Sequence, residues 1–211
     1  MKLIDLTHLI EPGMPVFPGT EPPILMGANT VERNGFAEKK LTLYSHTGTH
    51  MDAPAHMQAG GKTLDSYAVA DFFGPAVLAD FSRTSLQTIE LEHLAPYENA
   101  LRQAQFLILR TGWERHWGKP EYFAQFPALS PEAAAHVIGL GIKGVGVDAI
   151  SIDRMEDNHF PVHHLFFNAG MFIIENLTHL EQVTTQFTLG CFPMLIKDAD
   201  GAPARAVAIL D

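Results

Sequence analysis

One short segment constrains the fold of this chain more than any other, because it holds four side chains that can bind a metal. The segment reads Ser45-His46-Thr47-Gly48-Thr49-His50-Met51-Asp52-Ala53-Pro54-Ala55-His56, so three histidines and one aspartate occupy even positions. On a straight strand, His46 and His50 would share a face but lie about 13 Å apart, at roughly 3.3 Å per residue. That separation is too large for two nitrogens that each bind one ion at about 2 Å.

A helix would bring positions four apart together, but Pro54 and the Thr and Gly residues oppose a helix here. We therefore predict that a strand ends near His46 and that the chain turns sharply at Gly48, since glycine tolerates unusual backbone dihedrals. His46, His50 and Asp52 can then converge. Two imidazoles and one carboxylate are typical of a catalytic divalent metal with open positions. The alternative is a group of surface or hydrogen-bonded core side chains, and the density of the cluster favours a metal.

Composition indicates an acidic chain with a sizeable core. Hydrophobic residues make up 46% of the 211 residues and charged residues 18%, so global disorder is not expected. The 14 Lys and Arg against 24 Asp and Glu argue against a nucleic-acid partner, which needs clustered positive charge. The single cysteine, Cys191, excludes an internal disulfide and a cysteine-based zinc site, which leaves nitrogen and oxygen as metal donors.

The chain shows neither a membrane-spanning run nor a targeting segment. No stretch reaches the roughly 18 consecutive apolar residues that a spanning helix needs. The start, Met1–Leu6, contains Asp5 and does not resemble a signal peptide. We therefore expect a soluble cytoplasmic protein, with neither membrane nor nucleic acid as a partner. At this length a single domain over residues 1–211 is the expectation.

Apolar runs predict more strands than helices, and so favour an α/β or α+β domain with a mixed sheet. The strands are expected at 2–6, 39–44, 77–80, 106–110, 143–147, 171–175, 184–189, 194–197 and 204–210. Ser130-Pro131 is a strong start for a helix through Ile138, since serine caps and proline fits the first helical position. The proline-rich segment Met14–Pro23 is expected to be an irregular apolar loop that covers a site or packs on another subunit.

Carboxylates later in the chain offer further candidates. Glu175 ends the apolar run Met171–Ile174, so it is expected beside the core, where a cation is one way to satisfy its charge. A contact with solvent or an arginine is equally compatible with the spacing. Asp148 and Asp153 are expected to form turns or caps rather than to act in catalysis. His159 stays open, because it is close to this region in sequence.

The segment His46–His56 matches the signature HxGTHxDxPxH, and the chain resembles the Putative cyclase family, which includes bacterial kynurenine formamidases and isatin hydrolases. The resemblance extends over nearly the whole chain. It includes Asp5-Leu6-Thr7, Pro18-Gly19, Thr111-Gly112-Trp113, Gly146-Val147-Asp148, Ser151, Asp153, His163-His164 and Ile174-Glu175-Asn176-Leu177. One difference is Thr20, where many relatives carry Asp after Pro-Gly.

The resemblance implies a role for each residue of the signature. His46, His50 and Asp52 would bind the metal, usually zinc or manganese, and His56 would be the catalytic acid and base. Phe17, Phe36 and Trp113 are further candidates, for an aromatic wall around the substrate.

The resemblance also implies a second cluster, a histidine twelve residues before a glutamate. These are His163 and Glu175 here, with His164 as the competing choice. Asp52 would bridge the ions in members with two metals, so one or two ions per subunit are expected. The implied fold is a three-layer β/β/α swivelling-type domain that assembles as a homodimer or a larger homo-oligomer.

The activity implied by the resemblance is metal-dependent hydrolysis of a small amide. The leading reaction is that of an arylformamidase, which converts N-formyl-L-kynurenine and water into L-kynurenine and formate. One alternative is a cyclic amide or lactone hydrolase like the isatin hydrolases, which would use the same residues. Another is a metal-binding or sensory protein without catalysis, although the presence of His56 beyond the first metal's ligands favours an enzyme.

Overall fold

Eight strands make up the main sheet of this computed structural model, which describes residues 1–210. They are β1 (Lys2–Asp5), β4 (His50–Asp52), β5 (Phe73–Asp80), β7 (Phe106–Arg110), β9 (Gly144–Val147), β10 (Phe172–Glu175), β11 (Gln186–Pro193) and β12 (Gly201–Leu210). Their order is β1-β12-β11-β5-β7-β9-β10-β4, and a further pairing joins β4 to β12. All of the strands except β1 therefore form a closed, barrel-like ring of seven.

The three-residue strand β4 closes this ring, and it carries two of the predicted metal ligands. It pairs antiparallel with β10 on one side and with β12 on the other. His50 lies opposite Glu175, and Asp52 lies opposite Ile173. Directly opposed residues of antiparallel strands point to the same face. The pairing thus places the carboxylate of Glu175 beside the imidazole of His50.

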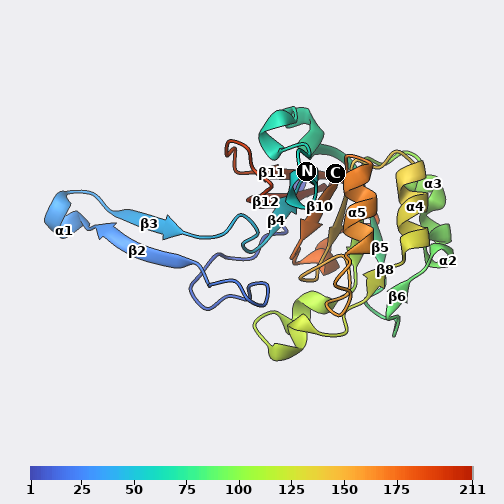
Figure 1. The fold of residues 1–211 in the computed structure, drawn as a ribbon, viewed down its shortest axis with the longest axis horizontal. Helices are drawn as coiled ribbons and strands as arrows, with labels where there is room; N and C mark the ends of the chain where they lie inside the picture. The colour runs from blue at the N-terminus through green and yellow to red at the C-terminus, as the bar shows by residue number, and fades with distance from the viewer. Residues whose placement is uncertain (211) are drawn as a thin grey trace.

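Strands β5, β7, β9 and β10 are parallel neighbours, and their side chains alternate between two cores. Leu107 and Leu109 of β7 join a cluster with the helices, whereas Phe106 and Ile108 join a second cluster with β11 and β12. Burial on both faces explains why these strands read as continuous apolar runs. Apart from α1 (Val31–Asn34), the α-helices lie on one side of the barrel (Figure 1). They are α2 (Leu91–Leu94), α3 (Glu98–Leu101), α4 (Pro131–Gly139) and α5 (Pro161–Asn168).

The two longer helices begin in different ways. Helix α4 begins as predicted, since the side chain of Ser130 accepts a hydrogen bond from the backbone N–H of Ala133 at 3.2 Å. Helix α5 was not predicted, because its N-cap, Phe160, has a left-handed backbone (φ 44°) and an apolar side chain. Its first N–H groups are capped instead by Asp153, which lies outside the helix.

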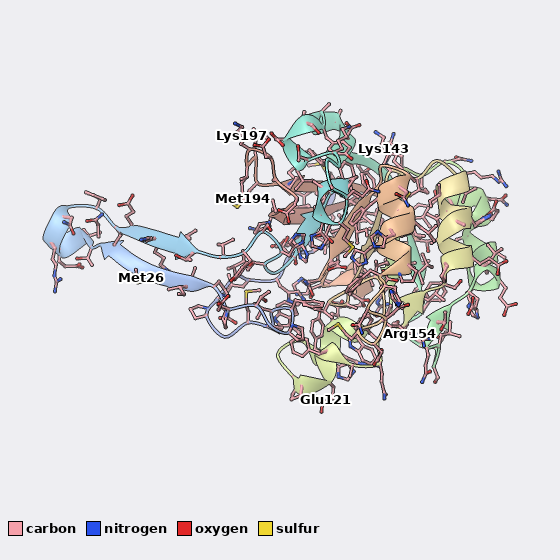
Figure 2. All side chains as sticks on the ribbon, viewed as in Figure 1. Met26, Glu121, Lys143, Arg154, Met194 and Lys197 are labelled. Atoms are coloured by element: carbon pink, nitrogen blue, oxygen red, sulfur yellow. The ribbon has the colours of Figure 1, made fainter. Side chains whose placement is uncertain are left out.

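A long hairpin leaves the barrel on the side opposite the helices (Figure 1). It consists of β2 (Ile24–Asn29) and β3 (Glu38–Thr42), joined by the short helix α1 (Val31–Asn34). We call residues 24–42 the arm. Every residue of β3 is exposed, and Figure 2 shows Met26 on the arm, away from the barrel. The strand expected at 39–44 therefore exists but belongs to the arm rather than to the main sheet.

The predicted mixed α/β content is confirmed, with one wrong strand. Residues 194–197 form an exposed connection between β11 and β12 rather than a strand. A small separate sheet pairs β6 (Thr88–Ile89) with β8 (Ala128–Leu129). Within residues 1–210, no helix combines the length and the apolar character needed to cross a membrane.

Candidate metal centre

Three residues of the signature segment, two of them in β4, bring their side chains together. The Nδ1 atom of His46 lies 2.6 Å from Oδ1 of Asp52, and the Nε2 atom of His50 lies 3.1 Å from the same oxygen. One donor atom from each of these residues lies within 4.8 Å of the others. His50 and Asp52 are buried, and His46 is partly exposed. The structure thus brings together the three side chains that the turn was predicted to join.

A second group of donors adjoins the first and shares Asp52 with it. It consists of Asp52, His163 of α5 and Glu175 of β10, all buried, with donor atoms within 4.8 Å of one another. The Nε2 atom of His163 lies 3.4 Å from Oε1 of Glu175. His164 is exposed and belongs to neither group. Successive residues of a helix point about 100° apart, so only one of the two histidines can face this cluster.

Two glycines allow the first group to form. Gly48 has φ +67°, in the left-handed region where a side chain is strained, and it makes the predicted turn. Gly201 of β12 lies under the ring of His46, and a Cβ atom there would be 2.5 Å from Cε1 of that ring. Glycine at 201 therefore permits the close approach of His46 to the barrel.

The outer nitrogens of two histidines are held by hydrogen bonds. Nδ1 of His50 lies 2.8 Å from the carbonyl oxygen of Gly48, so Nδ1 carries the proton of the neutral ring. Nδ1 of His163 lies 2.7 Å from Oδ2 of Asp153. Both Nε2 atoms are then directed at the carboxylates of the cluster. Histidines that bind metals are commonly oriented by such second contacts.

The expected structural roles of Asp148 and Asp153 are confirmed. Asp153 accepts hydrogen bonds from the backbone of α5, and it also orients His163, which was not predicted. Asp148 accepts bonds from the backbone N–H groups of Thr111 and Gly112 and thereby holds the turn after β7.

Asp200 is a neighbour of the site that the sequence pattern does not indicate. Its Oδ2 atom lies 2.9 Å from Nε2 of His46 and 3.6 Å from Nδ1 of His56. These three residues form a further group with donor atoms within 4.8 Å of one another. Asp200 immediately precedes β12, far from the signature in sequence, so only the closure of the barrel brings it here. No local signal could have identified it.

His56 lies beside the two donor groups that contain Asp52 and belongs to neither of them. It is the last residue of the 3₁₀ turn η1 (Pro54–His56), and its ring centroid is 3.9 Å from that of His46 and 6.4 Å from that of His163. It is partly exposed and faces the same cavity as the two groups. A side chain in this place can exchange protons with a molecule in the cavity.

A cavity of about 550 Å³ opens onto the cluster and is lined by all six predicted site residues. Phe17 and Thr20 of the proline-rich loop and Phe160 before α5 also line it. Phe17 thus lies where an aromatic wall was predicted, whereas the other two candidates do not line this cavity. Phe36 lies exposed on the arm, and Trp113 packs against the helix-side core. His159, which stayed open, lines a different cavity.

Charge within the cluster outweighs the effect of burial on two histidines. Burial favours the neutral ring of His46, but the carboxylates of Asp52 and Asp200 raise its pKa to about 10. Burial likewise opposes the charge on His163, while Asp153 and Glu175 raise its pKa to about 10. For His56, burial lowers the pKa below 6.5, and Asp52 only partly opposes this effect. His46 and His163 therefore hold protons that a bound cation would replace.

The donor set fits a divalent metal. The ion pairs of Asp52 and Glu175 within residues 1–210 are all with histidines, so no lysine or arginine neutralises these buried carboxylates. Nitrogen and oxygen donors in this combination suit zinc, manganese or iron, with positions left for water and substrate. The structure thus offers a site for a divalent metal next to a cavity that can hold a small molecule.

Comparison with known proteins agrees with this geometry. The family model described as Putative cyclase matches residues 4–154. The chain is 32% identical over 205 residues to the kynurenine formamidase of Bacillus mycoides (strain KBAB4), with 97% of this chain and 95% of that protein covered. The kynurenine formamidase of Bacillus cereus (strain ATCC 14579) is 32% identical over 206 residues, with the same coverage.

Solved structures with the same fold are also similar over almost the whole chain. An isatin hydrolase bound to the product analogue thioisatinate superposes with a TM-score of 0.91 at 22% identity, covering 99% of this chain and 92% of that one. A protein described as a potential metal-dependent hydrolase with cyclase activity superposes with a TM-score of 0.81 at 28% identity, covering 98% and 96%.

Proposed function

Because the chain belongs to the Putative cyclase family, we propose that it is a metal-dependent hydrolase of a small amide, an arylformamidase acting on N-formyl-L-kynurenine. One observation carries the proposal: buried carboxylates and histidines from β4, β10 and α5 converge on a cavity, and within residues 1–210 no lysine or arginine pairs with these carboxylates. Similarity to kynurenine formamidases along 97% of the chain supports the choice of substrate.

The proposed ligands are the members of the two donor groups. His46, His50 and Asp52 would hold one ion, and Asp52, His163 and Glu175 would hold a second. The sharing of Asp52 between the groups supports two ions, zinc or manganese, per subunit. A divalent ion bound there supplies Lewis acidity, which lowers the pKa of a coordinated water and polarises a carbonyl group.

His56 is the proposed acid and base. Its place at the cavity, outside both donor groups, leaves it free to move protons. It would take a proton from the attacking water as the new C–O bond forms at the formyl carbon. It would then give that proton to the aniline nitrogen as the C–N bond breaks, releasing formate and the free amine. Phe17 and Phe160 flank the cavity where an aromatic substrate ring could lie.

The second candidate is hydrolysis of a cyclic amide such as isatin, because an isatin hydrolase superposes with a TM-score of 0.91. The test is to measure formate release from N-formyl-L-kynurenine and ring opening of isatin with the same metal-loaded protein. We expect the larger kcat/KM for the formamide. A larger value for isatin would favour the second candidate. Inactivity on both, and on further formamides, imides and lactones, would favour a metal-binding protein without catalysis.

We also propose how the chain is organised and assembled. The proposed fold class is a single domain over 1–211 with three layers, in which opposite sides of the barrel form two β layers and the helices form the third. A homodimer is proposed because the arm exposes apolar side chains that a monomer would leave in water. These are Ile24, Met26, Val31, Phe36 and Leu41. A cytoplasmic location, in keeping with the free buried cysteine, completes the proposal.

The dimer proposal is tested by measuring the molar mass in solution. The double variant Ile24→Glu, Leu41→Glu places charges on the arm without touching the barrel. We expect the unmodified chain to elute as a dimer or larger species and the variant to elute as a monomer. A monomeric unmodified chain would contradict the proposal.

A further inference from the structure

The residue after Glu175 is a buried asparagine whose side chain reaches the turn of the signature segment. Asn176 is 2% exposed and has a left-handed backbone (φ 58°). Its Nδ2 donates to the carbonyl oxygen of Gly48 at 2.8 Å, and its Oδ1 accepts from the hydroxyl of Tyr122 at 2.7 Å. A carbonyl can only accept, so the contact with Gly48 determines which end of the amide is nitrogen. Both ends of this buried side chain therefore have partners.

The backbone of Asn176 also forms hydrogen bonds, one of them with the turn at Gly48 and Thr49. Its carbonyl oxygen accepts a hydrogen bond from the hydroxyl of Thr49 at 2.5 Å, and its N–H donates to the carbonyl oxygen of Ala149 at 3.0 Å. Asn176 thus holds the turn at two successive residues, Gly48 and Thr49. Because Asn176 directly follows Glu175, these bonds connect the two proposed donor groups.

The carbonyl oxygen of Gly48 connects Asn176 to the proposed ligand His50. It accepts from Nδ2 of Asn176 and from Nδ1 of His50, each at 2.8 Å. The bond from Nδ1 leaves the Nε2 atom of His50 to face Oδ1 of Asp52 at 3.1 Å and Oε2 of Glu175 at 3.6 Å. A shift of the carbonyl would turn the ring of His50 and move its Nε2 atom away from these carboxylates.

We propose that Asn176 and Tyr122 are positioning residues of the metal centre, which hold the Gly48 carbonyl so that His50 presents Nε2 to the metal. This inference rests on the proposed function. Neither residue lines the cavity, so neither acts on the substrate directly. Their effect passes through the carbonyl of Gly48 to one ligand.

The core holds the side chain of Tyr122 in place as a hydrogen-bond donor to Asn176. It is fully buried in the 3₁₀ turn η6 (Pro120–Phe123), its ring packs edge-on against Trp117 with centroids 5.1 Å apart, and its carbonyl oxygen accepts from Nε1 of Trp113. Burial, together with the charge of nearby Asp148, raises the pKa of its hydroxyl well above 10. The hydroxyl therefore keeps its proton and donates it to Asn176.

The test measures metal binding without substrate, with Co²⁺ as the probe. Metal-free protein is titrated with Co²⁺ against a chelator, and the visible absorption of the bound ion reports the ligand geometry. Tyr122→Phe removes the hydroxyl, and Asn176→Asp replaces the donor to Gly48 with an oxygen. We expect each variant to bind Co²⁺ about 10- to 100-fold more weakly, with an altered spectrum, since this is the usual effect of losing such an outer contact.

The matched control is Tyr97→Phe, which also removes a tyrosine hydroxyl. The hydroxyl of Tyr97 accepts a hydrogen bond from the backbone N–H of Asp80 on the helix side of the barrel. This variant should bind Co²⁺ with the affinity and spectrum of the unmodified chain. The double variant Tyr122→Phe, Asn176→Asp should lose less affinity than the two single losses combined, because both act on one chain of contacts. The two single variants break different bonds, so either one tests the inference if the other does not fold.

Wild-type affinity and spectrum in the folded Tyr122→Phe or Asn176→Asp variant would overturn the inference and leave the proposed function intact. So would an equal loss in Tyr97→Phe. Failure of the unmodified chain to bind Co²⁺ at all would overturn the proposed function and this inference together.

Discussion

Oδ2 of Asp200 lies 2.9 Å from Nε2 of His46 and joins the end of the β11–β12 connection to the signature segment. The same oxygen lies 3.6 Å from Nδ1 of His56. One carboxylate thus touches a proposed ligand and approaches the proposed acid and base. The next residue, Gly201, leaves room for the ring of His46 because it has no side chain. The chain at the start of β12 therefore contributes to the site through both Asp200 and Gly201.

Replacing Asp200 should therefore impair catalysis. In Asp200→Asn, the ring of His46 loses its charged acceptor, and we expect kcat/KM to fall by about 10- to 100-fold, as for other outer contacts of metal-binding histidines. Steady-state kinetics with the metal-loaded protein provides the measurement. Asp198→Asn is the matched control, because Asp198 is on the same connection and exposed. Equal kinetics for Asp200→Asn and the unmodified chain would show that the contact is dispensable.

The neighbouring histidines of α5 should differ sharply. His163 is buried with its Nε2 atom 3.4 Å from Glu175, whereas His164 is exposed at the rim of the cavity. We expect His163→Ala to lower the metal content per chain and His164→Ala to leave it unchanged, as measured by elemental analysis after dialysis. The reverse result would make His164 the ligand.

His50 and His56 should separate metal binding from turnover. His50→Ala removes a buried donor of the cluster, so the variant should lose metal and activity together. His56→Ala leaves both donor groups whole, so it should keep its metal while kcat falls by about 10²- to 10⁴-fold, the usual contribution of an acid–base group. Unchanged kcat in His56→Ala would remove this residue from the mechanism.

His8 should make folding sensitive to acid. Its ring stacks on Trp117 with centroids 3.7 Å apart, and burial, with a smaller effect of His179, lowers its pKa from 6.5 to about 4. The unfolded chain therefore takes up a proton first as the pH falls. The resulting stability is present above pH 6.5 and is lost between pH 6.5 and 4.

His8→Phe keeps a ring on Trp117 and removes this titration. The free energy of unfolding of the variant and of the unmodified chain is measured with denaturant at pH 7 and at pH 4. We expect the variant to gain stability relative to the unmodified chain when the pH is lowered from 7 to 4. The change should reach at most about 3 kcal/mol, at 1.36 kcal/mol per pKa unit. The same difference at both pH values would contradict the assignment.

Local signals in the sequence were enough for some of these features. The turn at Gly48 followed from the spacing of His46, His50 and Asp52 together with the helix-opposing Pro54, and the start of α4 followed from Ser130 and Pro131. In each case the residues that determine the structure are neighbours in the chain.

Other features depend on contacts between distant segments. The closure of the barrel by β4 requires pairing of residues 50–52 with residues 173–175 and 201–203, which no local pattern encodes. Helix α5 lacks a local cap because Asp153 supplies it from outside. Asp200 looks like an ordinary turn residue until the return of β12 brings it to His46. Alternation around Leu41 indicated a strand, but not that the strand lies on the exposed arm.

The central claim is that amide hydrolysis by this chain requires a divalent metal held by the cluster around Asp52. The most direct measurement is formate release from N-formyl-L-kynurenine by one preparation, before metal removal, after chelation and dialysis, and after zinc or manganese is restored. We predict that activity disappears with the metal and returns with it. A fully active preparation that contains no metal would contradict the account.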